Sequence, residues 1–396
     1  MKPDIKSLGR EEIASRFSEW QQPAYRVDQL LAWLHRRRVT SWDAMSNLPK
    51  TLREQLCATY SLTNFELVRK TGSSDVTQKF LWRLGDGALI ESVLIPANPA
   101  LYGEASDRHT LCVSTQVGCA YGCKFCASGL DGWKRNLLPH EIVEQVLAVE
   151  RLVSAARGQL PGDRLEPTAE VPASRRQIPE DSPATITPRP PARAVDNLVI
   201  MGMGEPLANY DHLLKALRIL NATWGYGIGA RKITISTSGL APQIRKLAEE
   251  PEQFRLAISL HGATDSVRER IMPVNRKYPL AELIPALEAY QSRKQKMLTF
   301  EFILIAGVND AREQIQPLAA LARRLHAKVN LIPYNSVAGL PWKRPTEAAC
   351  EAFAAELMRQ KVFVTLRREK GHDINAACGQ LRLKTERELA SLAPTA

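Results

Sequence analysis

The sequence predicts an α/β protein whose main part is a partial (β/α)6 barrel, preceded by an N-terminal helical domain and a small β-hairpin element. Six short hydrophobic runs between residues 110 and 333 alternate with stretches that have helical spacing. Hydrophobic strands that alternate with helices are typical of a parallel sheet covered by helices. Six repeats are fewer than the eight of a closed barrel, so we expect an open barrel with its active site at the carboxyl ends of the strands.

Residues 1–60 are predicted to form the helical domain, since RVDQLLAWLHRRR places its apolar side chains on one helical face. The basic run at residues 35–38 within it is either a solvated face or a phosphate contact. Residues 61–106 are predicted to form the hairpin element, because QKFLWRLGDGALIESVLIP contains two strand-like runs around Gly85-Asp86-Gly87. Glycine and aspartate between two such runs are a strong hairpin signal.

Residues 107–378 are predicted to form the barrel. Its strand-like runs are TLCVSTQ, NLVIMGM, KITIST, RLAISL, LTFEFILI and KVNLIP, and the helix-like stretches between them include HEIVEQVLAVERLV, DHLLKALRIL and REQIQPLAALARRLH. Residues 154–194 interrupt the first crossover with eight of the chain's 25 prolines. We expect them to be a disordered surface insert, and a tolerated insertion explains them more simply than a binding role. Residues 379–396 are assigned to a C-terminal tail.

The charge of the chain suggests a polyanionic partner. The formal net charge is +11, although a well-solvated basic surface would give the same value. The first residues lack the apolar segment of a signal peptide, and the hydrophobic run FEFILIAGV stops at nine residues. A membrane span needs roughly 18–20 apolar residues. We therefore expect a soluble, cytoplasmic monomer without a membrane partner.

Four of the seven cysteines lie within the stretch CVSTQVGCAYGCKFC at residues 112–126. A cytosolic chain keeps its thiols reduced, so this group favours metal binding or catalysis over a disulfide scaffold. Three of the four have the spacing C-x3-C-x2-C, and the fourth, Cys112, stands seven positions upstream. The question is whether Cys112 belongs to the same site or has a separate role.

These cysteines could bind structural zinc or an iron–sulfur cluster, and their spacing favours one of the two. Structural zinc takes four ligands, commonly as two separated pairs. Cys112 could be the fourth ligand, but the arrangement would be lopsided, and no second pair follows downstream. Three closely spaced thiolates, from Cys119, Cys123 and Cys126, suit a [4Fe–4S] cluster that keeps one iron open for an outside molecule. We favour the cluster, with a basic zinc-binding RNA module as the alternative.

The cysteine loop resembles the signature of the radical S-adenosylmethionine (SAM) enzymes, whose core is a partial (β/α)6 barrel. That signature is C-x3-C-x-aromatic-C, with Phe125 as the aromatic residue here. The resemblance implies that the open iron holds the methionine part of SAM. It also implies that an electron splits SAM into methionine and a 5′-deoxyadenosyl radical, and that Phe125 lies near the adenine.

The segment NLVIMGMGEPL supports the same resemblance. It fails the dinucleotide-binding pattern G-x-G-x-x-G because Leu207 stands at the third glycine. It is similar instead to the GGEP motif of radical SAM enzymes, which implies that Gly204 and Glu205 contact the SAM amino group. Glycine lets a backbone approach a ligand closely, and a carboxylate suits an ammonium group.

Five segments narrow the resemblance to the RlmN/Cfr RNA methyltransferases: MGMGEPL, TISTSGL, AISLHGATD, NLIPYN and DINAACGQL. The resemblance implies methylation of an adenosine carbon in 23S rRNA and, for RlmN types, in certain tRNAs. It also implies RNA binding by the helical domain and an electron donor such as flavodoxin or ferredoxin. Methylation at C2, as by RlmN, is the leading expectation. The alternatives are Cfr-like methylation at C8 and a radical SAM enzyme of this lineage with another substrate.

The residues expected to bind SAM follow from the same matched segments. They are Ser236, Ser259, Leu260, His261 and Asn335. Taken one at a time, they are explained as well by a strand-end hydroxyl, a core histidine and a turn asparagine. Their order at successive strand ends favours the functional interpretation.

Carbons 2 and 8 of adenine are electron-poor, so ordinary methyl transfer to them fails and a radical route is required. The resemblance implies a relay in which Cys378 accepts a methyl group from one SAM and a second SAM supplies the radical that activates it. Glu91 would remove the ring proton, and Cys112 would attack the Cys378 sulfur to release the product through a transient disulfide. Taken alone, Glu91 would be a charged strand residue facing water, and Cys378 a packed small side chain.

Overall fold

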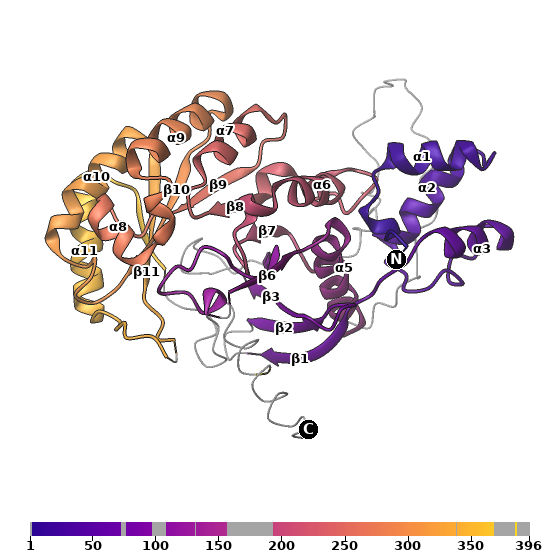
Figure 1. The fold of residues 1–396 in the computed structure, drawn as a ribbon, viewed down its shortest axis with the longest axis horizontal. Helices are drawn as coiled ribbons and strands as arrows, with labels where there is room; N and C mark the ends of the chain where they lie inside the picture. The colour runs from indigo at the N-terminus through magenta and orange to yellow at the C-terminus, as the bar shows by residue number, and fades with distance from the viewer. Residues whose placement is uncertain are drawn as a thin grey trace, which may run out of the picture.

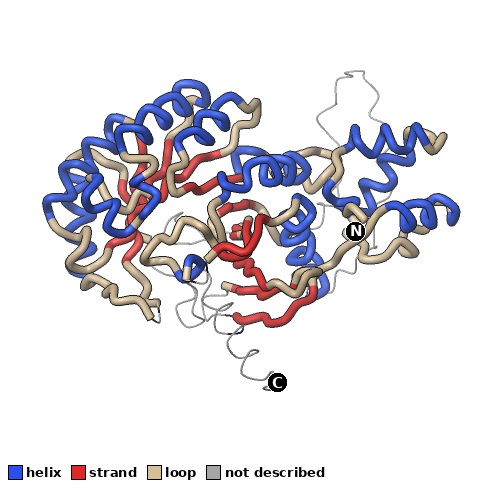
Figure 2. The backbone as a smooth tube through the Cα atoms, viewed as in Figure 1, coloured by secondary structure: helices blue, strands red, loops and turns tan. Residues whose placement is uncertain are grey.

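The computed structural model describes residues 2–72, 77–96, 108–130, 132–156, 193–337, 339–367 and 385. Its main sheet contains ten strands in the order β1-β2-β3-β4-β7-β8-β9-β10-β11-β12. From β4 onward neighbouring strands are parallel, whereas the pairs among β1 to β4 are antiparallel. The helices that connect the parallel strands lie along the outer side of the sheet (Figures 1 and 2). The predicted fold class is therefore confirmed.

The parallel part of the sheet contains the six predicted strands and a short seventh one. These strands are β4 (His109–Cys112), β7 (Asn197–Ile200), β8 (Ile233–Thr237), β9 (Arg255–Ser259), β10 (Leu298–Leu304), β11 (Ala327–Pro333) and β12 (Val364–Leu366). The helices between and after them are α5 (Pro139–Ala156), α6 (Tyr210–Asn221), α7 (Ala241–Glu249), α8 (Asp265–Ile271), α9 (Leu280–Lys294), α10 (Ile315–Arg324) and α11 (Glu347–Arg359).

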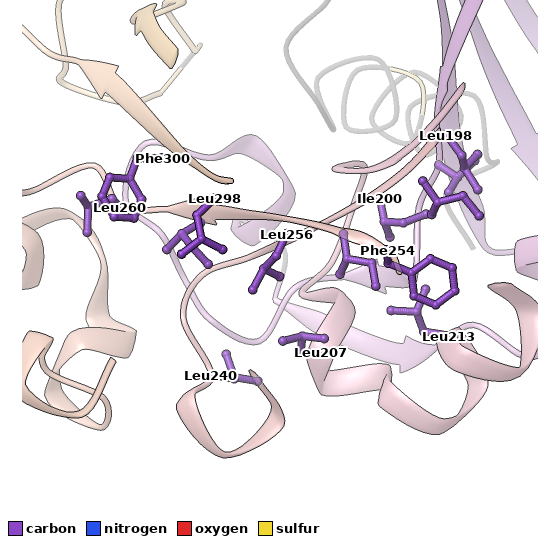
Figure 3. Close-up of a cluster of buried hydrophobic side chains, with 14 of the residues drawn as sticks. Leu198, Ile200, Leu207, Leu213, Leu240, Phe254, Leu256, Leu260, Leu298 and Phe300 are labelled. Carbon is purple, nitrogen blue, oxygen red and sulfur yellow. The ribbon is translucent and has the colours of Figure 1, made fainter. Parts of the chain in front are cut away.

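The hydrophobic core lies between the strands and these helices. Successive side chains of a strand point to opposite faces of its sheet. Leu198 and Ile200 of β7, Leu256 of β9 and Phe300 of β10 are buried in one cluster with Leu213 of α6 (Figure 3). Because these side chains occupy the helix-covered face, the intervening residues of the same strands face the concave side of the sheet.

The predicted hairpin extends the barrel sheet rather than standing apart from it. Its strands are β2 (Gln78–Arg83) and β3 (Leu89–Pro96), and β1 (Glu66–Gly72), which was not predicted, pairs with β2 at the edge. β3 pairs with β4 so that Val93 lies opposite Cys112. The concave face of the barrel therefore continues onto the hairpin.

The run TLCVSTQ does not form a single strand, because the ladder between β4 and β7 ends at Cys112. The side chain of Gln145 on α5 takes the place of a neighbouring strand. Its Oε1 accepts the N–H of Ser114 at 2.8 Å, and its Nε2 donates to the Ser114 carbonyl at 2.9 Å. The chain then enters β5 (Gln116–Gly118), which pairs with β6 (Trp133–Asn136) in a small antiparallel sheet. The cysteine loop connects these two strands.

The N-terminal residues form helices, as predicted. They are α1 (Arg10–Glu19), α2 (Tyr25–Leu31), a π-helical turn (Ala32–Arg36) and α3 (Lys50–Thr59). Their buried side chains form a hydrophobic cluster of their own, which includes Phe17, Leu30 and Leu56. The domain boundaries at residues 60, 106 and 378 stay predictions.

Buried contacts hold this helical unit against the barrel. Lys6 Nζ lies 2.6 Å from Glu144 Oε2 of α5, and both side chains are buried. The ring of His35 is buried and packs edge-on against Trp224, with ring centroids 5.8 Å apart. His35, the first residue of the basic run at 35–38, is therefore part of a packed contact and does not lie on a solvated face.

Several predictions concern residues outside the described part of the chain. Only residues 154–156 and 193–194 of the predicted insert at 154–194 are described, and of the predicted tail at 379–396 only Thr385 is. Within the described residues, no helix has both the length and the apolar character that a membrane crossing requires.

We expect His35 to make the protein sensitive to acid. Burial, followed by the nearby Lys6, lowers the pKa of His35 to about 3, and neither ring nitrogen has a hydrogen-bond partner in the described structure. An unfolded histidine has a pKa of about 6.5, so below that pH the unfolded chain binds a proton that the folded chain does not. This residue should therefore lower the free energy of unfolding by about 1.4 kcal/mol per pH unit below about pH 6.

Urea unfolding at several pH values between 7.5 and 5 tests this expectation. His35→Phe keeps the ring that packs on Trp224 and should reduce the pH dependence by that slope. His326→Gln removes an exposed histidine and should leave the slope as it is. Equal slopes for the wild-type protein and His35→Phe would contradict the assignment.

Candidate active site

The concave side of the sheet contains a cavity of about 390 Å³ at the carboxyl ends of the parallel strands. It gathers residues that are far apart in the sequence. The predicted site residues that line it are Cys112, Cys119, Cys123, Phe125, Cys126, Gly204, Glu205, Ser236, Ser259, His261 and Asn335. Their positions agree with the strand alternation, because Cys112, Ser236 and Ser259 lie on the face opposite to the helix-covered core.

Two predicted site residues among the described ones, Leu260 and Glu91, do not line this cavity. Leu260 is 1% exposed and packs in the hydrophobic core (Figure 3), and its N–H donates to the Glu301 carbonyl at 3.0 Å. Glu91 lies on β3 and is buried. Cys378 lies outside the described residues. Their proposed roles, like those of the cavity residues, stay predictions.

The cysteine loop is fixed by backbone hydrogen bonds at several points. Cys119 N–H donates to the Gly132 carbonyl at 3.0 Å, which closes the base of the loop. Lys124 N–H donates to the carbonyl of Ile271 at the end of α8 at 2.9 Å, and Trp342 Nε1 donates to the Lys124 carbonyl at 2.7 Å. The loop is thus attached to its own small sheet, to α8 and to the segment after β11.

The three loop thiols fit the cationic iron–sulfur core of a cluster. Burial raises the pKa of Cys119 to about 12 and that of Cys123 well above its usual value. Without a metal these thiols keep their protons, whereas a bound cation replaces the protons and stabilises the thiolates. The described residues contain no group of three or more potential ligands that converges on a single metal ion. The three thiols line one cavity, and in a [4Fe–4S] cluster each thiolate binds a different iron; Cys119, Cys123 and Cys126 would hold such a cluster.

Cys112 shares the cavity but not the loop. It ends β4, where it lies opposite Val93 of β3 on one side and Val199 of β7 on the other. Its side chain is 5% exposed. None of the described cysteines forms a disulfide with another. The rigid strand position keeps Cys112 in the sheet while the other three cysteines lie on the loop.

The Gly-Glu-Pro segment after β7 has a backbone that only glycine accommodates. Gly204 has a φ of +101°, and a Cβ there would lie 2.5 Å from Gln116 Cβ. Glu205 donates its N–H to Gln116 Oε1 at 2.8 Å. Its carboxylate accepts the N–H groups of Leu207 at 3.0 Å and Ser238 at 2.7 Å. Burial raises the pKa of Glu205, and these donors offset only part of the rise; a bound ammonium group would favour its ionised carboxylate.

His261 has one defined tautomer. Its Nδ1 accepts the N–H of Ile303 at 3.1 Å, so the neutral ring carries its proton on Nε2. Burial, followed by the nearby Arg268, lowers the pKa of His261 to about 3. The ring meets Phe125 edge-on, with centroids 4.7 Å apart. His261 has a φ of +54°, and Asn309 Nδ2 supports this turn by donating to the His261 carbonyl at 2.7 Å.

Glu91 has a buried partner that the sequence did not reveal. Lys79 Nζ of β2 lies 3.1 Å from Glu91 Oε2, and the two side chains are 0% and 3% exposed. Glu91 shares the strand face of Val93 and Ile95, which line the cavity. The period-two pattern of the two hairpin strands was the signal that could have indicated Lys79, since it places Lys79 and Glu91 on the same face.

Comparisons with known proteins show relatives along almost the whole chain. Residues 4–62 match the family described as ribosomal RNA large subunit methyltransferase N-terminal domain, and residues 191–318 match the radical SAM superfamily. The chain is 52% identical over 392 residues to a protein of Opitutus terrae named probable dual-specificity RNA methyltransferase RlmN 3, with 99% of this chain and 97% of the relative covered.

Two further relatives extend the comparison. A probable dual-specificity RNA methyltransferase RlmN of Akkermansia muciniphila is 48% identical over 386 residues, with 98% of this chain and 97% of the relative covered. The crystal structure of a radical SAM methyltransferase from Sphaerobacter thermophilus matches with a TM-score of 0.81 at 38% identity, covering 96% of this chain and 98% of that one.

The open barrel and the three-cysteine loop at its carboxyl end define a radical SAM enzyme. The similarity along the whole chain is more specific than the superfamily. The chain belongs to the RlmN family of radical SAM methyltransferases. The family predicted from the sequence is confirmed.

We expect Gly204→Ala to lower the stability of the cavity wall. The new Cβ would overlap Gln116, and the left-handed backbone would be strained for alanine. We expect a loss of about 2 kcal/mol or more in the free energy of unfolding. Thermal and urea unfolding measure it. Gly85→Ala has no atom within 4 Å of its Cβ and no positive φ, so it should change stability little. Equal effects of the two substitutions would contradict the assignment.

Proposed function

We propose that this protein methylates C2 of an adenosine in 23S rRNA and in tRNA through a methyl-cysteine intermediate. One observation supports this most strongly: Cys112, the three loop cysteines and the Gly204-Glu205 segment all line one cavity. A site for SAM and a cluster alone would not need a separate thiol on β4. The relatives that cover almost the whole chain are named dual-specificity RNA methyltransferases.

The reaction needs a radical because carbon 2 of adenine is not a nucleophile. When bound, the [4Fe–4S] cluster and SAM supply the one-electron chemistry that generates a 5′-deoxyadenosyl radical. In our proposal Glu205 and the strand-end residues Ser236, Ser259 and Asn335 orient SAM. The edge-on pair of Phe125 and His261 borders the adenine, with the Nε2 proton of His261 as a donor.

The remaining residues act on the methyl group and the base. Cys378 accepts the methyl group as a thiolate and later carries the methylene link to the adenine. The radical adduct on the adenine would return one electron to the oxidised cluster, and Glu91 takes the proton from the ring carbon; the ion pair of Glu91 with Lys79 orients the carboxylate. The Cys112 thiolate then attacks the Cys378 sulfur, so that a disulfide forms as the bond between this sulfur and the methylene carbon breaks. The electron pair of the broken bond takes up a proton, which completes the methyl group on the adenine. A thiol reductant must reduce that disulfide before the next turnover.

RNA recognition is assigned to the N-terminal helices together with the barrel. The net charge of +11 favours a polyanion. The helical unit is held against α5 by the buried Lys6–Glu144 pair, so a bound RNA would meet a fixed surface. A nucleotide in folded RNA must leave its stack to enter a buried cavity, so we expect base flipping at the target.

Modified-nucleoside analysis tests the proposed function. Protein reconstituted with iron and sulfide would be incubated with SAM, a reductant and either rRNA or tRNA, and the digested nucleosides analysed by mass spectrometry. We expect 2-methyladenosine from both RNAs. Formation of only 8-methyladenosine would contradict C2 specificity in favour of Cfr-like chemistry. Cleavage of SAM without RNA modification would indicate another substrate.

Single cysteine substitutions should separate the two thiol roles. Cys112→Ala should still form the link between Cys378 and the adenine, but the product should stay covalently bound because no thiol attacks Cys378. Cys378→Ala should form no covalent complex at all. Denaturing gels with labelled RNA detect these complexes.

The control for this experiment is Cys350→Ala, which removes a buried thiol on α11 that does not line the cavity. It should release product like the wild-type protein. Normal turnover by Cys112→Ala would show that Cys112 has no resolving role.

A further inference from the structure

Arg268 of α8 is a buried cation that contacts only neutral groups. Its side chain is 0% exposed. Nη1 donates to Asn275 Oδ1 at 2.8 Å and Nη2 donates to the Ser238 carbonyl, while Nε has no hydrogen-bond partner. The neighbouring Asp265 uses its carboxylate to accept from Asn275 Nδ2 at 2.9 Å and from Leu280 N at 2.8 Å. In the described part of the chain, therefore, Arg268 has no ion-pair partner.

Such an arrangement is costly without an anion nearby. An arginine does not lose its proton in proteins, so it cannot neutralise itself as a buried lysine can. Removing an unpaired guanidinium from water is strongly unfavourable, and two neutral acceptors offset only part of that cost. The burial of Arg268 thus indicates that an anionic group completes its environment in the working enzyme.

The position of Arg268 indicates where this anion lies. The Ser238 carbonyl accepts a hydrogen bond from Arg268, and the Ser238 N–H donates to Glu205. Ser238 also lines the cavity. The same helix ends at Ile271, whose carbonyl binds Lys124 in the cysteine loop. Arg268 therefore lies behind the cavity wall, next to the loop that would hold the cluster.

One further feature agrees with this position. Gly239 follows Ser238 with a φ of +105°, and a Cβ on it would lie 3.0 Å from Arg268 Nη2. The glycine therefore leaves room for the guanidinium.

We propose that Arg268 stabilises the negative charge of the thiolate-bound cluster and makes its one-electron reduction more favourable. This inference rests on the cluster of the proposed function but not on its RNA substrate. A [4Fe–4S] cluster with three thiolates is anionic, and it gains one more negative charge when a reductant such as dithionite donates one electron. No bond forms or breaks in this step. A fixed cation in a buried, low-dielectric site favours the more negative state.

The test is a redox titration of the reconstituted protein with dithionite, followed by the EPR signal of the reduced cluster. Arg268→Gln keeps amide donors but removes the charge, whereas Arg268→Lys keeps the charge. For Arg268→Gln we expect the equilibrium constant for reduction to fall about tenfold, which is a shift of about 59 mV to more negative potential for a one-electron couple. Arg268→Lys should stay near the wild-type potential.

The matched control is Arg270→Gln. Arg270 lies on the same helix but is exposed, so solvent screens its charge and the potential should not change. An unchanged potential in Arg268→Gln, or equal shifts in Arg268→Gln and Arg268→Lys, would overturn the proposal.

A variant that loses the cluster gives no redox potential, so bound iron and sulfide are also measured for each variant. Loss from Arg268→Gln but not from Arg268→Lys, with both folded by circular dichroism, would support the role of the charge. Loss from both would mean that Arg268 is purely structural. Absence of a cluster from the wild-type protein would instead contradict the proposed function.

Discussion

The alternation of side chains along one continuous sheet is the constraint on which the rest of the structure depends. Each parallel strand commits its leucines and isoleucines to the helix-covered face, as Leu198 and Ile200 do in β7. The residues between them are thereby directed to the concave face, where the cavity lies. Because β3 pairs with β4 in register, Glu91 and Cys112 belong to the same face as Ser259, although they come from different parts of the fold. A slip of one residue in any strand would move these groups into the core.

The cavity is formed by the strands of the sheet and by the cysteine loop, and contacts from other elements hold this loop in place. Gln145 ends the first parallel strand early and lets the chain turn into the small sheet that carries the cysteine loop. α8 then binds that loop through Ile271 and places Arg268 behind it. The buried charge of Arg268, which has no ion-pair partner in the described part of the chain, is unfavourable in the polypeptide alone. An anionic cluster held by the loop thiols would complete its environment.

Local sequence patterns predicted the barrel strands and the cysteine loop. The features that they did not predict depend on burial in the folded structure. The strands of the barrel were predictable because each buries a hydrophobic face, whereas β1, with the sequence ELVRKTG, is a polar edge strand with little such signal. Cys119 and its loop partners were predictable because their spacing is local. Arg268 was not, since an isolated basic residue is usually solvated. The alternation of the hairpin strands could place Lys79 on the face of Glu91, but only the packed structure shows that Lys79 and Arg268 are buried. The roles assigned to Glu91 and Cys378 came from family resemblance alone.

The central claim is that Cys112 stands apart from the cluster cysteines because it reacts with Cys378. The most direct measurement is peptide mapping under non-reducing conditions, after a single turnover on RNA without a thiol reductant. We expect a disulfide-linked peptide pair that contains Cys112 and Cys378, formed only when RNA is present. Recovery of Cys112 as a free thiol after product release, or its linkage to one of the loop cysteines, would contradict the resolving role of Cys112.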